Sequence, residues 1–202
     1  GVNMLKVGLT GGIGSGKGTA SSILAKFGSY IFDADPEAKK ILNNNKNVQN
    51  DIITEFGDDV LDHNGLIDKK KLAKVAFQDE DHQIILNSII HPFVFKELDK
   101  QFKKISNQNK HVSFIVDGAL IFESGLDQHL DSVVLIASSL KYRIERALKR
   151  GNLSREDILR RIDLQWTDEQ KAEMADHTIY NNGTEKELEE KIREFHKKHI
   201  YR

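Results

Sequence analysis

Cysteine is missing from this chain of 202 residues, and proline occurs only twice. Without cysteine there can be no disulfide bond, no thiolate ligand for zinc and no cysteine nucleophile. No apolar run approaches the roughly 18 residues that a transmembrane helix needs, and the N-terminal residues lack the pattern of a secretory leader. We therefore expect a cytoplasmic protein that does not associate with a membrane.

An excess of charge of either sign is also missing. The chain has 31 acidic and 30 basic side chains, which gives a formal net charge of −1. A protein that binds nucleic acid through a general positive field is therefore not expected, and no feature indicates an obligate protein partner. Hydrophobic residues make up 39% of the chain, enough for the core of one domain with a small insertion. An anionic ligand would have to be bound by local groups.

Short apolar segments alternate with helical patterns over much of the chain. The expected strands are 5–10, 30–32, 112–116, 132–137 and 178–180. Strands that alternate with helices predict an α/β fold, with a parallel sheet covered by helices on both faces.

Two regions without strand signals interrupt this alternation. Residues 36–110 carry apolar side chains at three- and four-residue spacing, which predicts a helical insert. Within it, Pro92 is expected to keep His91 extended and so to mark a helix boundary. Residues 139–171 form an arginine-rich helical segment. The predicted organisation is a core of residues 4–35, 111–138 and 172–202, the insert 36–110 and a lid 139–171.

A glycine-rich loop follows the first expected strand and has the form Gly11-x-x-x-x-Gly16-Lys17. Glycines allow the backbone to turn tightly, so that several N–H groups converge on one anion. The helix that begins near Lys17 adds its positive end, and the lysine adds a full charge for the terminal phosphates. The loop therefore predicts a P-loop kinase-like core that binds a nucleoside triphosphate.

One position departs from the usual loop pattern. The residue after the lysine is normally Ser or Thr, whose hydroxyl reaches Mg²⁺, but here it is Gly18, followed by Thr19. Either Thr19 takes over this role, or the ion is held by phosphates, water and carboxylates. Mg²⁺ usually keeps several waters, which makes the second arrangement inexpensive.

Asp33 and Asp35 follow the second expected strand, at the edge where open α/β sheets bind ligands. If strand geometry continued through Ala34, both carboxylates would face one spot beside the loop. A carboxylate there can orient a hydroxyl acceptor and take its proton, or contact Mg²⁺ through water. The alternative is that they cap the helix expected to begin at Pro36, for which Asp35 is well placed.

Asp117 ends the third expected strand in the manner of the acidic residue that supports Mg²⁺ in P-loop enzymes. The alternative is an ordinary turn residue before Gly118. Six residues further on, Glu123 lies among apolar side chains and is a weaker candidate for the acceptor site.

Six arginines lie between residues 143 and 161. Arg146 and Arg150 are four residues apart and so share one helix face, and Gly151 separates two helical stretches. This arrangement suits a lid that closes over ATP and supplies planar donors to the transferring phosphoryl group. The alternative is a solvated face whose arginines pair with neighbouring acidic side chains.

Taken together, these motifs closely resemble the dephospho-coenzyme A kinase family over the chain from Met4 to the last helix. The motifs that carry the resemblance are Gly8–Lys17, Asp33-Ala34-Asp35, Ile90-His91-Pro92, Val116-Asp117, Phe122-Glu123, Arg146, Arg150, Arg161-Ile162-x-x-Gln165 and Ala175-Asp176-x-x-Ile179-x-Asn181-x-Gly183. The glycine loop is common to many kinases, whereas the Asp-Ala-Asp, His-Pro and Ala-Asp-x-x-Ile-x-Asn elements are far more particular. Gly18 departs from the family pattern, as does Gly118-Ala119, where the family usually carries proline.

The resemblance implies transfer of the γ-phosphate of ATP to the ribose 3′-hydroxyl of dephospho-coenzyme A. It implies Mg²⁺ as cofactor, Asp35 as the base or orienting group, and Lys17, Arg146 and Arg150 as further catalytic residues. The residues implied to bind ATP are Gly12, Ile13, Gly14, Ser15, Gly16, Lys17, Gly18, Thr19, Asn181 and Gly183. Those implied at the acceptor side are Asp33, Asp35, His91, Asp117 and Glu123, of which Asp33 and Asp117 join Thr19 as candidate metal contacts.

Two other functions fit parts of the sequence less well. A nucleoside monophosphate kinase has the same loop and lid, but its acceptor phosphate calls for arginines where this chain has Asp33 and Asp35. A GTP-binding switch needs a guanine-reading Asn-Lys-x-Asp segment, and residues 138–141 do not provide it.

Overall fold

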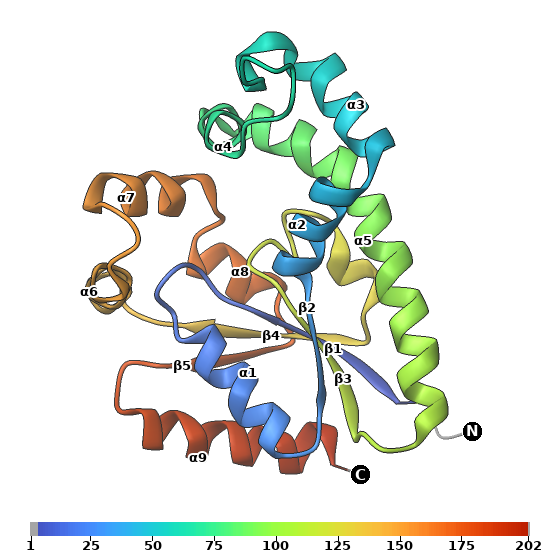
Figure 1. Ribbon diagram of the computed structural model, residues 1–202. Helices are drawn as coiled ribbons and strands as arrows, with labels where there is room; N and C mark the ends of the chain where they lie inside the picture. Colours follow the sequence, from blue (N-terminus) through green and yellow to red (C-terminus); the bar gives the residue numbers. More distant parts are fainter. Residues whose placement is uncertain (1–3, 202) are drawn as a thin grey trace. The chain divides into compact units, whose positions relative to one another are not determined.

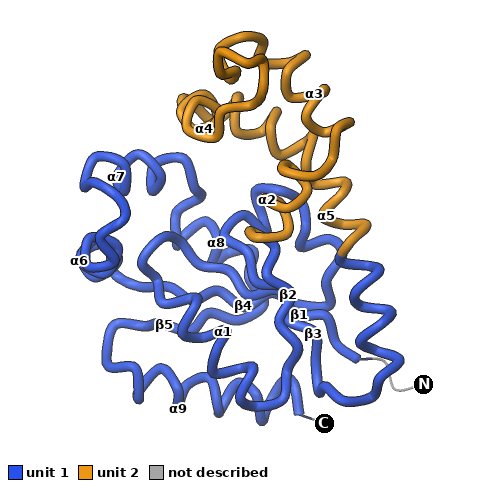
Figure 2. Tube along the Cα trace, viewed as in Figure 1, with its two compact units in different colours: residues 1–34, 98–202 blue, residues 35–97 orange. Residues whose placement is uncertain are grey.

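The computed structural model describes residues 4–201, so Arg202, which falls in a segment expected to form the core, lies outside it. The chain divides into two compact units, one of residues 1–34 and 98–202 and one of residues 35–97 (Figure 2). The first unit holds the sheet.

The sheet has five parallel strands in the order β2-β3-β1-β4-β5 (Figure 1). The strands are β1 (Leu5–Thr10), β2 (Tyr30–Asp33), β3 (Ser113–Asp117), β4 (Ser132–Ala137) and β5 (His177–Tyr180). All five lie within one or two residues of the expected positions, and the predicted α/β parallel fold is confirmed. Central strands buried on both faces explain why the segments read as nearly continuous apolar runs.

Helices cover both faces of this sheet. The helices of the first unit are α1 (Lys17–Lys26), the last part of α5 (Glu80–Gln108), α6 (Leu140–Arg150), α7 (Arg155–Leu164), α8 (Asp168–Met174) and α9 (Glu185–Phe195). The unit also has a 3₁₀ turn at Leu126–His129 and a π-helical turn at His196–Ile200. Figure 1 shows α1 and α9 together on one face, where Ile23 and Ile192 join Ile115 in a buried cluster. Because strand side chains alternate, Phe114 faces the other side, and its ring meets that of Phe102 at 5.4 Å.

The second unit is helical. Its helices are α2 (Ala34–Asn44), α3 (Lys46–Phe56), α4 (Lys69–Ala76) and the first part of α5 (Glu80–Gln108), with a 3₁₀ turn at Gly57–Val60 and an isolated bridge between Leu61 and Ile67. Val48, Ile52 and Val60 are fully buried there. Within residues 4–201, no helix has the length and apolar character needed to cross a membrane.

Two local expectations were wrong. The second strand ends at Asp33 and α2 begins at Ala34, so Asp35 lies in a first helical turn and the alternation argument for the two aspartates does not apply. Helix α5 also continues through Pro92, with no boundary at His91. A proline inside a helix removes one hydrogen bond and crowds the preceding turn, at a cost of about 3 kcal/mol, and burial of Ile90 and Val94 on either side of it helps to offset that cost.

Candidate functional site

The glycine loop joins β1 to α1 and requires glycine at two positions. Gly14 and Gly16 have φ angles of 75° and 94°, a region that side chains disfavour. A Cβ on Gly14 would lie 2.0 Å from the main-chain oxygen of Arg143, and one on Gly16 would lie 2.2 Å from Asn181 Nδ2. That amide donates to the Ser15 carbonyl at 2.9 Å. The loop is thus fixed between neighbouring elements, with the N-terminus of α1 behind it.

Lys17 opens α1 and its ammonium donates to the carboxylate of Asp117. Asp117 ends β3 and is paired in register with Leu9 of β1 and with Asp33 of β2. Because parallel strands end at the same edge of the sheet, two carboxylates and one ammonium are gathered beside the loop. Asp117 is only 4% exposed, so the ion pair keeps a buried carboxylate compensated.

Arg146 in α6 makes three contacts to this part of the molecule. Its guanidinium donates to Ser138 Oγ at 2.9 Å, to the Asn181 carbonyl at 2.9 Å and to the Gly14 carbonyl at 3.3 Å. The side chain expected as a lid arginine therefore joins the glycine loop to the ends of β4 and β5.

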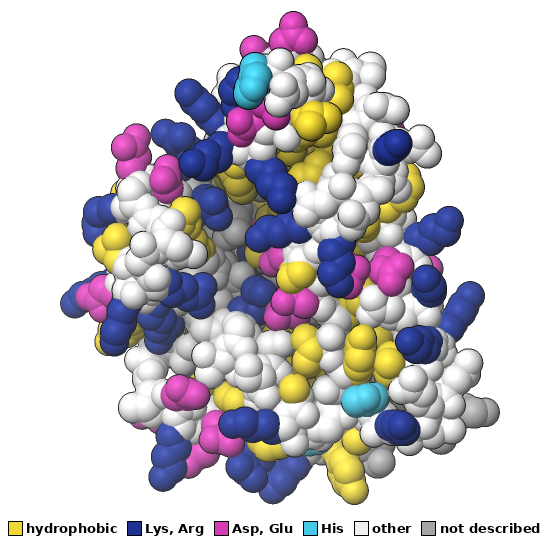
Figure 3. All heavy atoms as spheres, in the orientation of Figure 1, with side chains coloured by type: hydrophobic (Ala, Val, Ile, Leu, Met, Phe, Trp, Pro, Cys, Tyr) yellow, Lys and Arg dark blue, Asp and Glu magenta, His cyan; other side chains and the backbone are white. Residues whose placement is uncertain are grey.

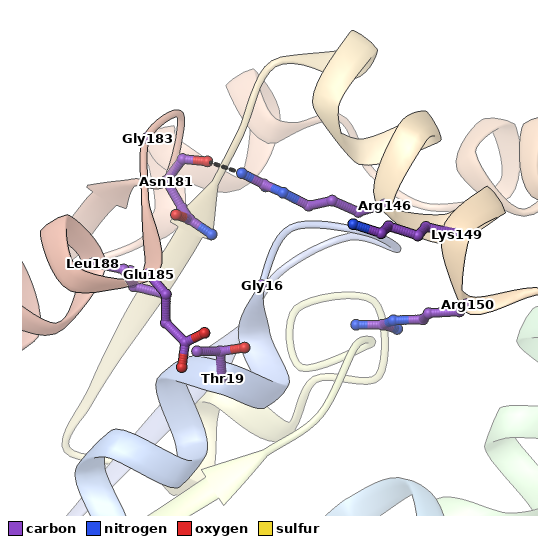
Figure 4. A pocket seen from close by; sticks show the side chains of 9 residues that line it. All are labelled: Gly16, Thr19, Arg146, Lys149, Arg150, Asn181, Gly183, Glu185 and Leu188. Atoms are coloured by element: carbon purple, nitrogen blue, oxygen red, sulfur yellow. Dashed lines mark hydrogen bonds between the residues drawn. The ribbon is translucent and has the colours of Figure 1, made fainter.

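A pocket of about 340 Å³ opens beside the start of α1. It is lined by Gly16, Thr19, Arg146, Lys149, Arg150, Asn181, Gly183, Glu185 and Leu188. Figure 4 shows Lys149 and Arg150 reaching toward it from α6, and Glu185 beside Thr19 on the other side. Basic side chains also gather over α6 and α7 on the face shown in Figure 3. The pocket offers cationic donors at one wall and an apolar surface at Leu188.

Glu123 and Lys171 form a buried ion pair further inside the first unit. Their side chains are 10% and 0% exposed, and Lys171 Nζ lies 3.6 Å from Glu123 Oε2 and 3.3 Å from the Ala119 carbonyl that it donates to. Burial raises the pKa of Glu123 and lowers that of Lys171, while the charge of each partner opposes the shift of the other. The preceding ring, Phe122, stacks on Trp166 with its centroid at 6.3 Å.

The oxygen ligands near the loop suit a Mg²⁺ ion that is shared with substrate phosphates and water, and not a metal ion bound by protein side chains alone. Among residues 4–201 there is no group of three or more His, Cys, Asp or Glu side chains that could hold an ion. Thr19 offers a hydroxyl in the pocket, and Asp33 and Asp117 offer carboxylates at neighbouring strand ends. Mg²⁺ is commonly held by one or two carboxylates together with waters and substrate phosphates, and this oxygen donor set fits that pattern.

The first unit brings together most of the residues expected at the nucleotide. The loop, Asp33, Asp117, Arg146 and Asn181 lie around one end of the sheet, and the pocket adds Thr19, Arg150 and Gly183.

Asp35, His91 and Glu123 were also expected at the acceptor side. Asp35 lies in the first turn of α2 and His91 lies in α5, both in the second unit. Burial lowers the pKa of His91 to about 4, so it is neutral at physiological pH. Glu123 is held in the ion pair with Lys171. Their roles toward substrate stay predictions.

Several residues of the site were missed by sequence reasoning. Arg143 and Asp168 contact the back of the glycine loop and the end of β4, and Lys149 and Glu185 line the pocket. Arg143 is three residues before Arg146, and this spacing, which puts both on one helix face, was the available signal. Nothing in the sequence indicated Asp168.

Known proteins resemble this chain over nearly its whole length. The family model described as "CoaE: Dephospho-CoA kinase" matches residues 5–187. A dephospho-CoA kinase of Fusobacterium nucleatum is 36% identical over 96% of this chain and 98% of its own length. Two solved structures are each 27% identical to this chain and match 96% of both chains. They are a Thermus thermophilus protein with a TM-score of 0.78 and a dephospho-CoA kinase of Campylobacter jejuni with a TM-score of 0.66.

Proposed function

Because this chain belongs to the dephospho-CoA kinase family, we propose that it phosphorylates the ribose 3′-hydroxyl of dephospho-coenzyme A with ATP, which yields coenzyme A and ADP. The observation that carries the proposal is the glycine loop at the start of α1. Lys17 forms an ion pair with Asp117 there, and a pocket opens beside the loop. Full-length coverage of the relatives supports extending their activity to the whole chain.

ATP is proposed to bind with its phosphates on the loop and its base toward Asn181 and Gly183. Main-chain N–H groups and the positive end of α1 favour the phosphate charge. An ammonium has three donors, so Lys17 can contact a phosphate oxygen while it stays near Asp117. Lys149 and Arg150 are exposed at the pocket wall and can supply charge to the transferring group.

Asp35 is proposed to orient the acceptor hydroxyl and accept its proton, as a carboxylate does in kinases. Mg²⁺, when bound with ATP, neutralises charge on the phosphates. Thr19, Asp33 and Asp117 are the side chains proposed to hold it, directly or through water. His91 and Glu123 complete the set proposed for the acceptor side.

The decisive experiment is a coupled assay of ADP release with MgATP and alternative acceptors. Dephospho-coenzyme A is expected to support turnover, while AMP, CMP and a reaction without acceptor are expected to give only background. Turnover with AMP alone would contradict the proposal and indicate a nucleoside monophosphate kinase. We further propose that the reaction takes place in the cytoplasm, and we propose no protein or nucleic-acid partner for it.

A further inference from the structure

Arg143 carries a charge but is only 5% exposed, and the proposed reaction gives it no role. It lies in the first turn of α6. Its Nε donates to the main-chain carbonyl of Ile13 at 3.0 Å, inside the glycine loop. Burying a guanidinium is costly unless it is paired, so a specific arrangement must compensate for its burial.

The loop is shaped to receive this residue. A Cβ on Gly12 would lie 1.9 Å from one terminal nitrogen of the Arg143 guanidinium, and a Cβ on Gly14 would lie 2.0 Å from the Arg143 carbonyl oxygen. No left-handed φ is found at Gly12. Close contact with Arg143 is therefore the reason that the structure gives for a glycine at position 12.

Asp168, at the start of α8, holds the other side of the guanidinium. Its Oδ1 lies 3.5 Å from Arg143 Nη1, and its Oδ2 accepts the Ser138 amide at 3.1 Å. Asp168 is therefore fixed to the end of β4 and is itself mostly buried, at 15% exposure. The guanidinium is held between a rigid carboxylate and the back of the loop.

We propose that Arg143 is a positioning residue that holds the glycine loop in its anion-binding conformation, and that Asp168 sets the direction of its guanidinium. A contact to the Ile13 carbonyl orients the peptide that follows it, because a peptide is planar, and so helps direct the loop N–H groups toward the phosphates. A loop that is already ordered binds ATP without a further ordering cost. The inference rests on the proposed ATP site but not on the identity of the acceptor.

The test is Arg143→Met, with direct ATP binding measured by calorimetry and steady-state kinetics measured with dephospho-coenzyme A. We expect ATP affinity to fall about tenfold or more, because a loop that must be ordered on binding costs affinity, and the KM for dephospho-coenzyme A to change less than twofold. The matched control is Arg193→Met, an exposed arginine of α9 in a surface pair with Glu189, which should bind ATP normally.

A double variant distinguishes a loss of ATP binding from misfolding. Arg143→Met leaves Asp168 without its nearest cation, whereas Arg143→Met combined with Asp168→Asn removes both charges and keeps an acceptor for the Ser138 amide. A double variant that is folded and binds ATP about tenfold more weakly supports the proposal. Normal ATP affinity in either folded variant, or equal losses of affinity for both substrates, overturns it. Wild-type protein that binds ATP but does not phosphorylate dephospho-coenzyme A would instead contradict the proposed function.

Discussion

The charged side chains of the first unit form two groups that differ in their access to solvent. Lys149 and Arg150 are exposed at the pocket, where water solvates them until a ligand arrives. Arg143 and Lys171 are buried, and each lies within 3.6 Å of a carboxylate. Hydrated charges are available to bind phosphate, whereas buried charges are already committed to partners. Loss of a charge in the pocket should therefore reduce binding or catalysis, and loss of a buried charge should first reduce stability.

The largest effect is expected from Lys171→Met, which leaves the Glu123 carboxylate buried without its partner. Breaking a buried pair in this way typically costs about 3–5 kcal/mol of the free energy of unfolding. Trp166 is the only tryptophan and stacks on Phe122 beside this pair, so urea denaturation followed by its fluorescence reports on the region. Restoring much of the stability with Lys171→Met combined with Glu123→Leu would identify the unpaired carboxylate as the cause.

The single variant should also change how stability depends on pH. Burial raises the pKa of Glu123 above its ordinary value of 4.5, and removing Lys171 takes away a charge that lowers it. The folded protein then binds a proton that the unfolded chain releases, so stability should rise as the pH falls from the raised pKa toward 4.5. A stability loss that is the same at every pH in this window would contradict this account of the pair.

Lys17 lies between the two groups, because it is paired with Asp117 and also borders the glycine loop, and Lys17→Ala tests its part in catalysis. Loss of the ammonium at the loop should reduce kcat/KM on the order of 10²-fold or more, by analogy with loss of a preorganised electrostatic donor. Lys26→Ala, at the exposed last turn of the same helix, is the matched control and should be active. Normal activity of Lys17→Ala would remove the loop from the proposed ATP site.

Asp35→Asn separates proton transfer from nucleotide binding. A general base typically contributes at least about 10²-fold, so kcat should fall by about this factor while ATP affinity stays within a few-fold of wild type. Asp51→Asn, at an exposed position of α3 in the same unit, provides the control. A kcat that is unchanged in Asp35→Asn would exclude this carboxylate from the mechanism.

The contrast between the two groups also shows what the sequence could predict. The loop and strands were predictable because glycine spacing and apolar runs are local signals, and Asp117 followed from its place at a strand end. The pairing of Arg143 with Asp168 joins residues 25 positions apart on different helices, and no periodicity links them. The boundary at Ala34 was missed because Asp33-Ala34-Asp35 suits either a strand end or a first helical turn, and tertiary packing decides between them.

The smallest effect is expected at Gly18, the second residue of α1. This glycine is exposed, its φ is outside the left-handed region, and a Cβ built on it meets no atom within 4 Å. Gly18→Ser should therefore fold normally, gain about 0.5 kcal/mol of helix propensity and offer the hydroxyl that the usual loop pattern directs at Mg²⁺.

Gly18→Ala gains helix propensity without a hydroxyl and is the matched control. If Thr19, water and carboxylates now hold the ion, the serine variant alone should lower the half-activating Mg²⁺ concentration, by about twofold or 0.4 kcal/mol. Titration of Mg²⁺ at fixed ATP measures this difference. Equal Mg²⁺ requirements in the serine and alanine variants would mean that the ion does not approach position 18, and that this chain holds Mg²⁺ from the carboxylate side of the site instead.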